Sequence, residues 1–121
     1  MIKKFDFYGA NNGAYPHGTL IQATNGELYG MTRYGGANDY GVLFQYDPAA
    51  NTLIKKLDFD GANNGRNPQG SLMQATDGKL YGMTYNGGTN NGGVLFQYDP
   101  AANTLIKKLD FDGKNNGSYP R

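Results

Sequence analysis

The chain has 121 residues, which allows one domain, and its net charge of +1 gives no electrostatic reason to expect nucleic acid or an anionic membrane as a partner. It has no cysteine, which excludes a disulfide framework and thiolate zinc sites, and it has no run of about 18 apolar residues that could cross a membrane. The 19 glycines and the single glutamate favour short strands and tight turns over helices.

The sequence repeats with a period of 52 residues. Aligning residues 1–52 with residues 53–104 without gaps gives about 37 identical positions, and residues 105–121 then begin a third copy. A period of this size indicates a solenoid, a propeller or an array. The pattern inside one copy has to decide among them.

The expected elements begin with residues 1–17, a surplus outer strand (1–7) and its link. Residues 18–69 and residues 70–121 then hold four strands each. In the second set, runs rich in β-branched and aromatic residues are bounded by turn residues and predict strands at 71–76, 79–85, 93–99 and 104–111. The first two of these runs are joined by Asp77-Gly78, a dipeptide favoured in two-residue hairpin turns.

Four strands in about 50 residues, joined by hairpins and repeated in tandem, are typical of a β-propeller blade. Alternation is weak, because Leu95 interrupts the apolar face of the run 93–99, as expected for a sheet that is packed on both sides. The pair Lys107-Lys108 suits an outer edge strand, although it is also consistent with ordinary solvated charge. We therefore predict an all-β fold of four-stranded antiparallel meanders, blade 1 at 18–69 and blade 2 at 70–121.

The segments DGKLYGMT, NGGTNNGGVLFQYDPA and KKLDFDGANNG resemble the tandem units called GloVer repeats, and the resemblance covers the whole chain. It implies propeller-like blades. Family members are secreted or surface-anchored bacterial proteins, which is the localisation implied for a parent protein, while that of this chain is unknown. Their repeats carry no established catalytic motif, so no enzymatic activity is implied. Because they usually bear many copies and an anchor domain, we expect a fragment or an engineered chain.

Two blades cannot close a ring, so we expect a homo-oligomer. Each chain supplies two sets of strands, which requires an even number of blades: three chains with six blades first, four chains with eight next. Three copies of the fourth strand (1–7, 53–59 and 105–111) compete for two sets of partners. We expect strand 1–7 to complete the blade of a neighbouring chain, or to lie spare at the junction.

Differences between the two copies concentrate in or beside the loops at one end of the expected blades. Tyrosine, asparagine and arginine on loops over a rigid scaffold are typical of recognition surfaces, although loop tips also tolerate change. If this end binds a ligand, the first candidate is a glycan. The candidate ligand-binding residues are Tyr15, His17, Arg33, Tyr34, Tyr40, Arg66, Asn67, Tyr85 and Asn86.

Four side chains with oxygen atoms are candidate calcium ligands: Asp58, Asp60, Asn63 and Asn64. The spacing fails the EF-hand pattern because Ala62 and Gln69 stand at ligand positions, so we interpret the four as turn-forming residues. His17 is the only histidine, and no serine is placed beside it as a nucleophile. We predict no catalytic residue, no metal site and no cofactor.

Three functions remain, in this order of preference. The first is a non-enzymatic, self-assembling propeller scaffold with no chemistry of its own. The alternative is an extracellular, lectin-like module that binds glycans through its Tyr- and Asn-rich end. A hydrolase or lyase comes last, since it would need an acid–base pair facing the central channel.

Overall fold

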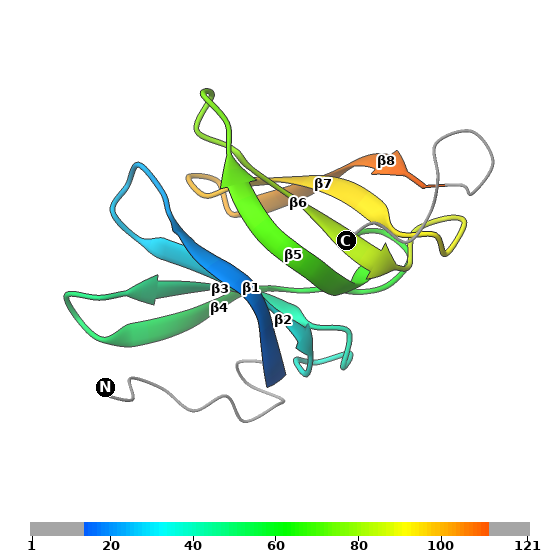
Figure 1. The fold of residues 1–121 in the computed structure, drawn as a ribbon, viewed down its shortest axis with the longest axis horizontal. Helices are drawn as coiled ribbons and strands as arrows, with labels where there is room; N and C mark the ends of the chain where they lie inside the picture. The colour runs from blue at the N-terminus through cyan, green and yellow to red at the C-terminus, as the bar shows by residue number, and fades with distance from the viewer. Residues whose placement is uncertain (1–13, 112–121) are drawn as a thin grey trace.

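The computed structural model describes residues 14–111, with side chains from residue 20 onward. These residues form two four-stranded antiparallel sheets, each a meander whose neighbouring strands follow one another in sequence, and no helix (Figure 1). The first sheet contains β1 (Ala14–Gln22), β2 (Leu28–Tyr34), β3 (Val42–Asp47) and β4 (Thr52–Asp58). The second contains β5 (Arg66–Gln74), β6 (Leu80–Asn86), β7 (Val94–Asp99) and β8 (Thr104–Asp110). The predicted all-β fold of four-stranded meanders is confirmed.

The turns are built by the residue types that the sequence places there. Between β5 and β6, the Lys79 backbone N–H donates to Asp77 Oδ1 at 2.9 Å, and Gly78 has a φ of 85°. Between β7 and β8, the Ala101 backbone N–H donates to Asp99 Oδ1 at 3.0 Å. The Tyr98 hydroxyl donates to Asn103 Oδ1 at 2.6 Å, and the first sheet repeats this contact at 2.6 Å.

One boundary differs from the sequence-based prediction. β5 begins at Arg66, not at residue 71, so the predicted border between the blades lies inside a strand. The sequence here (RNPQG) looks like a link, but Arg66 pairs with Asn86 and Pro68 with Thr84. The strand tolerates it because Asn67 adopts a φ of 56° and the register shifts after Gln69, as at a β-bulge. β1 likewise begins at Ala14, inside the predicted link; the predicted strand 1–7 lies outside the described residues.

The lysine pairs lie on edge strands, as predicted. β4 and β8 each form one edge of a sheet. Lys55 on β4 forms an ion pair with Asp58 at 2.9 Å, and Lys107 on β8 forms the same pair with Asp110 at 3.0 Å. Charge along such an edge discourages pairing with further strands. The edges formed by β4 and β8 are therefore poor templates for pairing with a further strand.

The two sheets pack face to face, with β5 of the second sheet lying against β1 and β2 of the first. β5 contacts both β1 and β2, and Figure 1 shows β1 and β5 next to each other near the middle of the molecule. Two aromatic pairs cross the contact: Tyr29 with Tyr98, whose ring centroids are 6.1 Å apart, and Phe59 with Phe96 at 5.5 Å. All four residues belong to the buried core, and tilted pairs at these distances add to the area they bury.

Candidate functional site

The contact between the sheets, here called the junction, pairs residues that differ between the two copies of the repeat. Arg33 on β2 has Tyr85 as its counterpart 52 residues on, and Gln69 on β5 has His17 as its counterpart. In the amide orientation that satisfies both groups, Gln69 Oε1 accepts from Arg33 Nε at 3.1 Å and from Nη2 at 3.3 Å. Gln69 is buried, so this contact is shielded from water.

Asn67 forms three hydrogen bonds, of which the first two join its sheet to the first sheet and the third stays within the second sheet. Its backbone N–H donates to the Tyr40 carbonyl oxygen at 2.8 Å, and its side-chain N–H donates to the Arg33 carbonyl oxygen at 3.1 Å. Its side-chain oxygen accepts from Asn86 Nδ2 at 3.3 Å. The left-handed φ of 56° that aims these groups suits asparagine better than most residues. Asn67 therefore holds the junction together, which a freely exposed recognition residue would not do.

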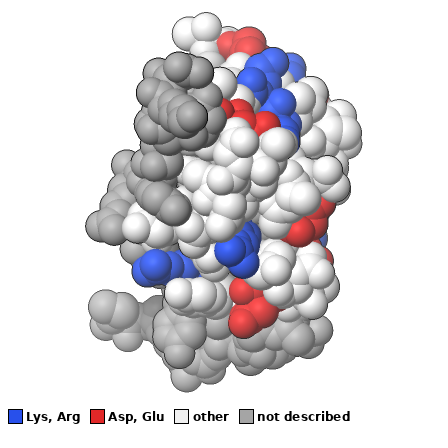
Figure 2. All heavy atoms as spheres, turned by 90° about the vertical axis from the view of Figure 1, so that its right-hand side faces the viewer, with Lys and Arg blue, Asp and Glu red and all other residues white. Residues whose placement is uncertain are grey.

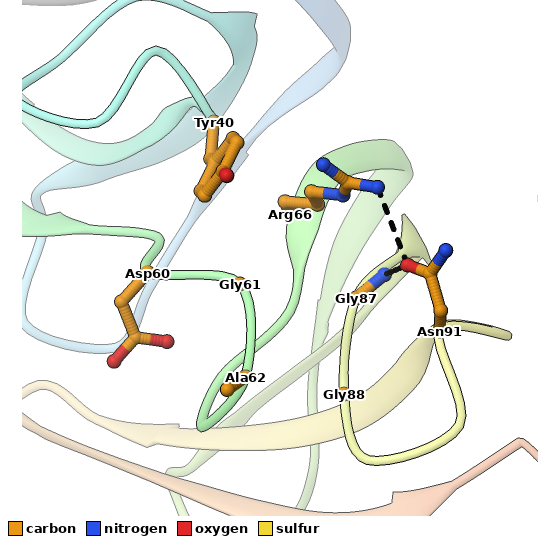
Figure 3. A pocket seen from close by; sticks show the side chains of 8 residues that line it. All are labelled: Tyr40, Asp60, Gly61, Ala62, Arg66, Gly87, Gly88 and Asn91. Atoms are coloured by element: carbon orange, nitrogen blue, oxygen red, sulfur yellow. Dashed lines mark hydrogen bonds between the residues drawn. The ribbon is translucent and has the colours of Figure 1, made fainter.

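A recess opens at the end of the junction where the β2–β3 and β6–β7 loops lie (Figure 3). Its volume is about 350 Å³. The side chains of Tyr40 and Arg66 face each other across it, with the guanidinium carbon 5.2 Å from the tyrosine ring centroid. Arg66 Nη2 also donates to Asn91 Oδ1 at 3.4 Å. We call this the junction recess, and it is lined by Tyr40, Asp60, Gly61, Ala62, Arg66, Gly87, Gly88 and Asn91.

The glycines in the junction recess have their backbone N–H groups engaged. Gly61 donates to the Gly65 carbonyl oxygen at 2.9 Å, Gly88 to the Gly61 carbonyl oxygen at 2.6 Å, and Gly87 to Asn91 Oδ1 at 2.9 Å. Glycine is needed at Gly61, where φ is 94° and an added Cβ would meet the Tyr40 ring at 3.1 Å. The backbone wall therefore offers no free N–H group at these three residues.

The carboxylate of Asp60 accepts hydrogen bonds within its own loop, in agreement with the sequence-based interpretation of Asp60 as a turn-forming residue. Its Oδ1 accepts from the backbone N–H groups of Asn63 and Asn64, both at 3.0 Å, and its Oδ2 accepts from Asn63 Nδ2 at 3.3 Å. Figure 3 shows its carboxylate pointing away from Arg66. No group of three or more His, Cys, Asp or Glu side chains that could hold a metal ion occurs in the described part of the chain.

The structure brings together only some of the predicted ligand-binding residues. Tyr40 and Arg66 line the junction recess, while Arg33 lies over the ring of Tyr34, 5.4 Å from its centroid, outside it. Tyr85 and Asn86 end β6. The backbones of Tyr15 and His17 belong to β1, and their side chains lie outside the description. The sequence-based choice missed the contributions of Asp60, Gly61, Ala62, Gly87, Gly88 and Asn91.

The model of the Gloeobacter/Verrucomicrobia repeat matches residues 1–121. The chain belongs to this family. The predicted resemblance to GloVer repeats is thereby confirmed over both copies. No curated protein matches the chain.

The two copies of the Gloeobacter/Verrucomicrobia repeat bury the same positions to different extents. In the first sheet, Tyr29, Met31 and Leu43 belong to the core, and Ile21 and Leu57 pack against it. Their counterparts in the second sheet face away from the first sheet and are half-buried or exposed, with 62% of Met73 accessible. We call this surface the outer face of the second sheet: Met73, Tyr81, Met83, Leu95 and Leu109.

The opposite faces show the reverse asymmetry. Leu72, Leu80, Phe96 and Tyr98 of the second sheet lie in the core, because the first sheet covers them. The counterparts of Leu72 and Leu80 are Leu20, which is exposed, and Leu28, which is half-buried. Phe44, the counterpart of Phe96, is buried as well, so the asymmetry on these faces holds at Leu20 and Leu28 and not at every position.

Two titratable groups have shifted pKa values. Burial raises the pKa of the Tyr98 hydroxyl above its usual range, and the neighbouring Tyr29 and Asp99 act in the same direction. Partial burial would raise the pKa of Asp110, but hydrogen bonds from Thr89 and Lys107 outweigh it, so the pKa lies below its ordinary value. Neither group lines the junction recess, so these shifts concern stability and not ligand chemistry.

Proposed function

We propose that this chain is a self-assembling repeat module in which the outer face of the second sheet packs on the first sheet of another copy. The observation that supports the proposal is the unequal burial of equivalent residues. Within one chain, a second sheet covers Ile21, Tyr29 and Met31, whereas no described sheet covers Met73, Tyr81 and Met83. The junction inside the chain is thus a template for the contact between chains.

The proposed contact is head-to-tail, since it joins two different faces. Contacts of this kind form rings when the rotation between subunits closes, and open filaments when it does not. A closed ring of radially packed four-stranded meanders is a β-propeller, and such rings typically have 4–8 blades. With two blades a chain, we expect three chains and six blades first, and four chains with eight blades next. The module has no chemistry of its own in this proposal.

The surface charge is compatible with a protein partner of the same kind. Figure 2 shows Lys and Arg side chains close to Asp and Glu side chains on one side of the molecule, with uncharged residues over much of that view. A single-sign patch would favour nucleic acid or an anionic surface. In the described part of the chain, no helix is long and apolar enough to cross a membrane. Burial of apolar area is therefore the driving force that we assign to assembly.

The experiment compares two exposed side chains on the second sheet. Met73→Glu places a charge on the outer face and should lower the mass measured by light scattering. Ile106→Glu is the matched control. Ile106 is 52% exposed, and its counterpart Ile54 remains 48% exposed although the second sheet packs on the first, so an equivalent contact between chains should not bury Ile106. If Ile106→Glu dissociates the assembly as much as Met73→Glu does, the contact between chains does not copy the junction. If neither variant dissociates it, the outer face is not the contact.

A second candidate function is glycan binding at the junction recess. Two of the predicted ligand-binding residues, Tyr40 and Arg66, line a cavity of about 350 Å³, within the size range of small-molecule sites. A glycan array probed with the intact protein tests it. Tyr40→Gly, which introduces the residue found at the same position of the second copy, Gly92, should abolish a genuine signal. A signal that survives this change would place the binding elsewhere.

A further inference from the structure

The junction recess contains an arginine, Arg66, that has no carboxylate partner among the described residues. The ion pairs among the described residues use Lys55, Lys79 and Lys107, and none uses Arg66. Its guanidinium has five N–H donors, of which one reaches Asn91, at 3.4 Å. Tyr40 holds the planar group from one side at 5.2 Å. Arg66 is therefore oriented, charged and able to donate to an anionic group that enters the recess.

The surroundings of Arg66 favour a single negative charge over a phosphate. Phosphate sites usually combine several free backbone N–H groups or more than one cation. Here the N–H groups of Gly61, Gly87 and Gly88 are all engaged within the protein, and no lysine of the described part of the chain lines the recess. Asp60 adds a negative charge to the wall. A planar carboxylate matches the guanidinium in shape and carries only one charge.

The rest of the recess suits a compact, hydroxyl-rich body attached to that carboxylate. The Tyr40 ring offers an apolar surface and a hydroxyl group. Asn91 offers an amide whose oxygen is already engaged and whose Nδ2 has no hydrogen-bond partner among the described residues. The volume of about 350 Å³ has room for one sugar ring. Aromatic rings and side-chain amides are groups that bind hydroxylated ligands.

We propose that the junction recess binds one sugar residue that carries a carboxylate, a uronic acid, with its carboxylate on Arg66. The inference rests on the glycan-binding candidate and goes further by naming the ligand class and the site. It does not depend on assembly, because every lining residue belongs to one chain. Tyr40 corresponds to Gly92 and Arg66 corresponds to Ala14, so the next junction of an assembled ring would lack both groups. The site therefore occurs once in each chain.

The test is a calorimetric titration of the intact protein with glucuronate, glucose, glucose 6-phosphate and acetate. We expect glucuronate to bind at one site in each chain, and each of the other three compounds to bind at least about tenfold more weakly. Glucose lacks the carboxylate, acetate lacks the sugar ring, and glucose 6-phosphate carries a phosphate with a second charge. Arg66→Ala, the residue of the first copy, should weaken glucuronate by about tenfold or more. Lys108→Ala removes a positive charge from an exposed residue of β8 outside the recess and should leave the affinity unchanged.

Each other outcome overturns a defined part of the account. Equal binding of glucose and glucuronate, unaffected by Arg66→Ala, overturns the uronic acid and leaves the glycan-binding candidate in place. If acetate, or a peptide through its terminal carboxylate, binds as tightly as glucuronate, the claim that the ligand is a sugar is wrong. Tighter binding of glucose 6-phosphate overturns the preference for a single charge. Two sites a chain contradict the position of the site, and a glycan array without any signal removes the candidate function together with this inference.

Discussion

Leu20 and Leu72 occupy the same position in the two repeats, yet 51% of Leu20 is exposed and only 5% of Leu72. Their immediate sequences are closely similar, so the difference comes from the neighbouring sheet that one of them has. A repeat that buries one face only when a neighbour is present has to stack to complete its core. The proposed assembly would bury Leu20 in the way that the first sheet already buries Leu72.

The same pair provides a stability test at a protein concentration where the chains are dissociated. Leu72→Ala removes a buried side chain and should lower the free energy of unfolding by about 2–5 kcal/mol. Leu20→Ala acts on an exposed side chain and should lower it by less than about 1 kcal/mol. Urea unfolding of both variants measures the difference. Equal losses would mean that both faces are equally buried in the single chain, against the proposed asymmetry.

Gly82 on β6 tests the close packing of the core. A Cβ at this position would lie 2.6 Å from Phe96 Cζ and 3.0 Å from a Leu72 methyl carbon. Gly82→Ala should therefore overpack the core and cost about 1–3 kcal/mol in the free energy of unfolding. Chemical denaturation measures it. An unchanged or higher stability would show that Phe96 can move aside without cost.

Thr84 is a buried residue whose hydroxyl makes two hydrogen bonds. It donates to the Asn86 carbonyl oxygen at 2.9 Å and accepts from the Val94 backbone N–H at 3.1 Å, and it has no exposed surface. Thr84→Val keeps the shape but leaves the Val94 N–H unpaired, which should cost about 1–3 kcal/mol. Thr84→Ser keeps the hydroxyl and is the control. If serine is as destabilising as valine in thermal unfolding, the hydroxyl contributes nothing.

Much of the fold could be predicted because local chemistry determines it. The Asp77-Gly78 turn, the apolar run from Val94 to Asp99 and the lysines on the edge strands all act over short distances along the chain. The start of β5 could not be predicted in this way. Its first residues have the composition of a link, and only pairing with β6 makes them a strand.

The candidate site was harder to predict, because it depends on which loops meet. Asp60, Gly87 and Asn91 are far apart from Tyr40 in sequence and come together only when the second sheet packs on the first. A signal was nevertheless present. Tyr40 and Arg66 both differ between the copies, and so do Arg33 and Gln69, so paired differences marked the residues that contact each other across the junction.

Asp110 predicts how stability changes with pH. Its pKa is lowered in the folded chain, where the Thr89 backbone N–H donates to its carboxylate at 2.9 Å and Lys107 forms an ion pair with it. A lowered pKa stabilises the fold above the ordinary pKa of an aspartate, about 3.9, and this contribution is lost as the pH falls through the folded value. Nuclear magnetic resonance titration of the carboxyl group should give a midpoint below that of an unfolded peptide. A midpoint at or above the peptide value would contradict the contacts.

The mass of the protein in solution tests the central claim most directly. A chain of 13.1 kDa that stacks through its outer face should give a light-scattering mass of about three times this value for six blades, or about four times for eight. Met73→Glu should reduce that mass toward a single chain, and Ile106→Glu should not. A monomer that stays stable across the concentrations used would contradict the account.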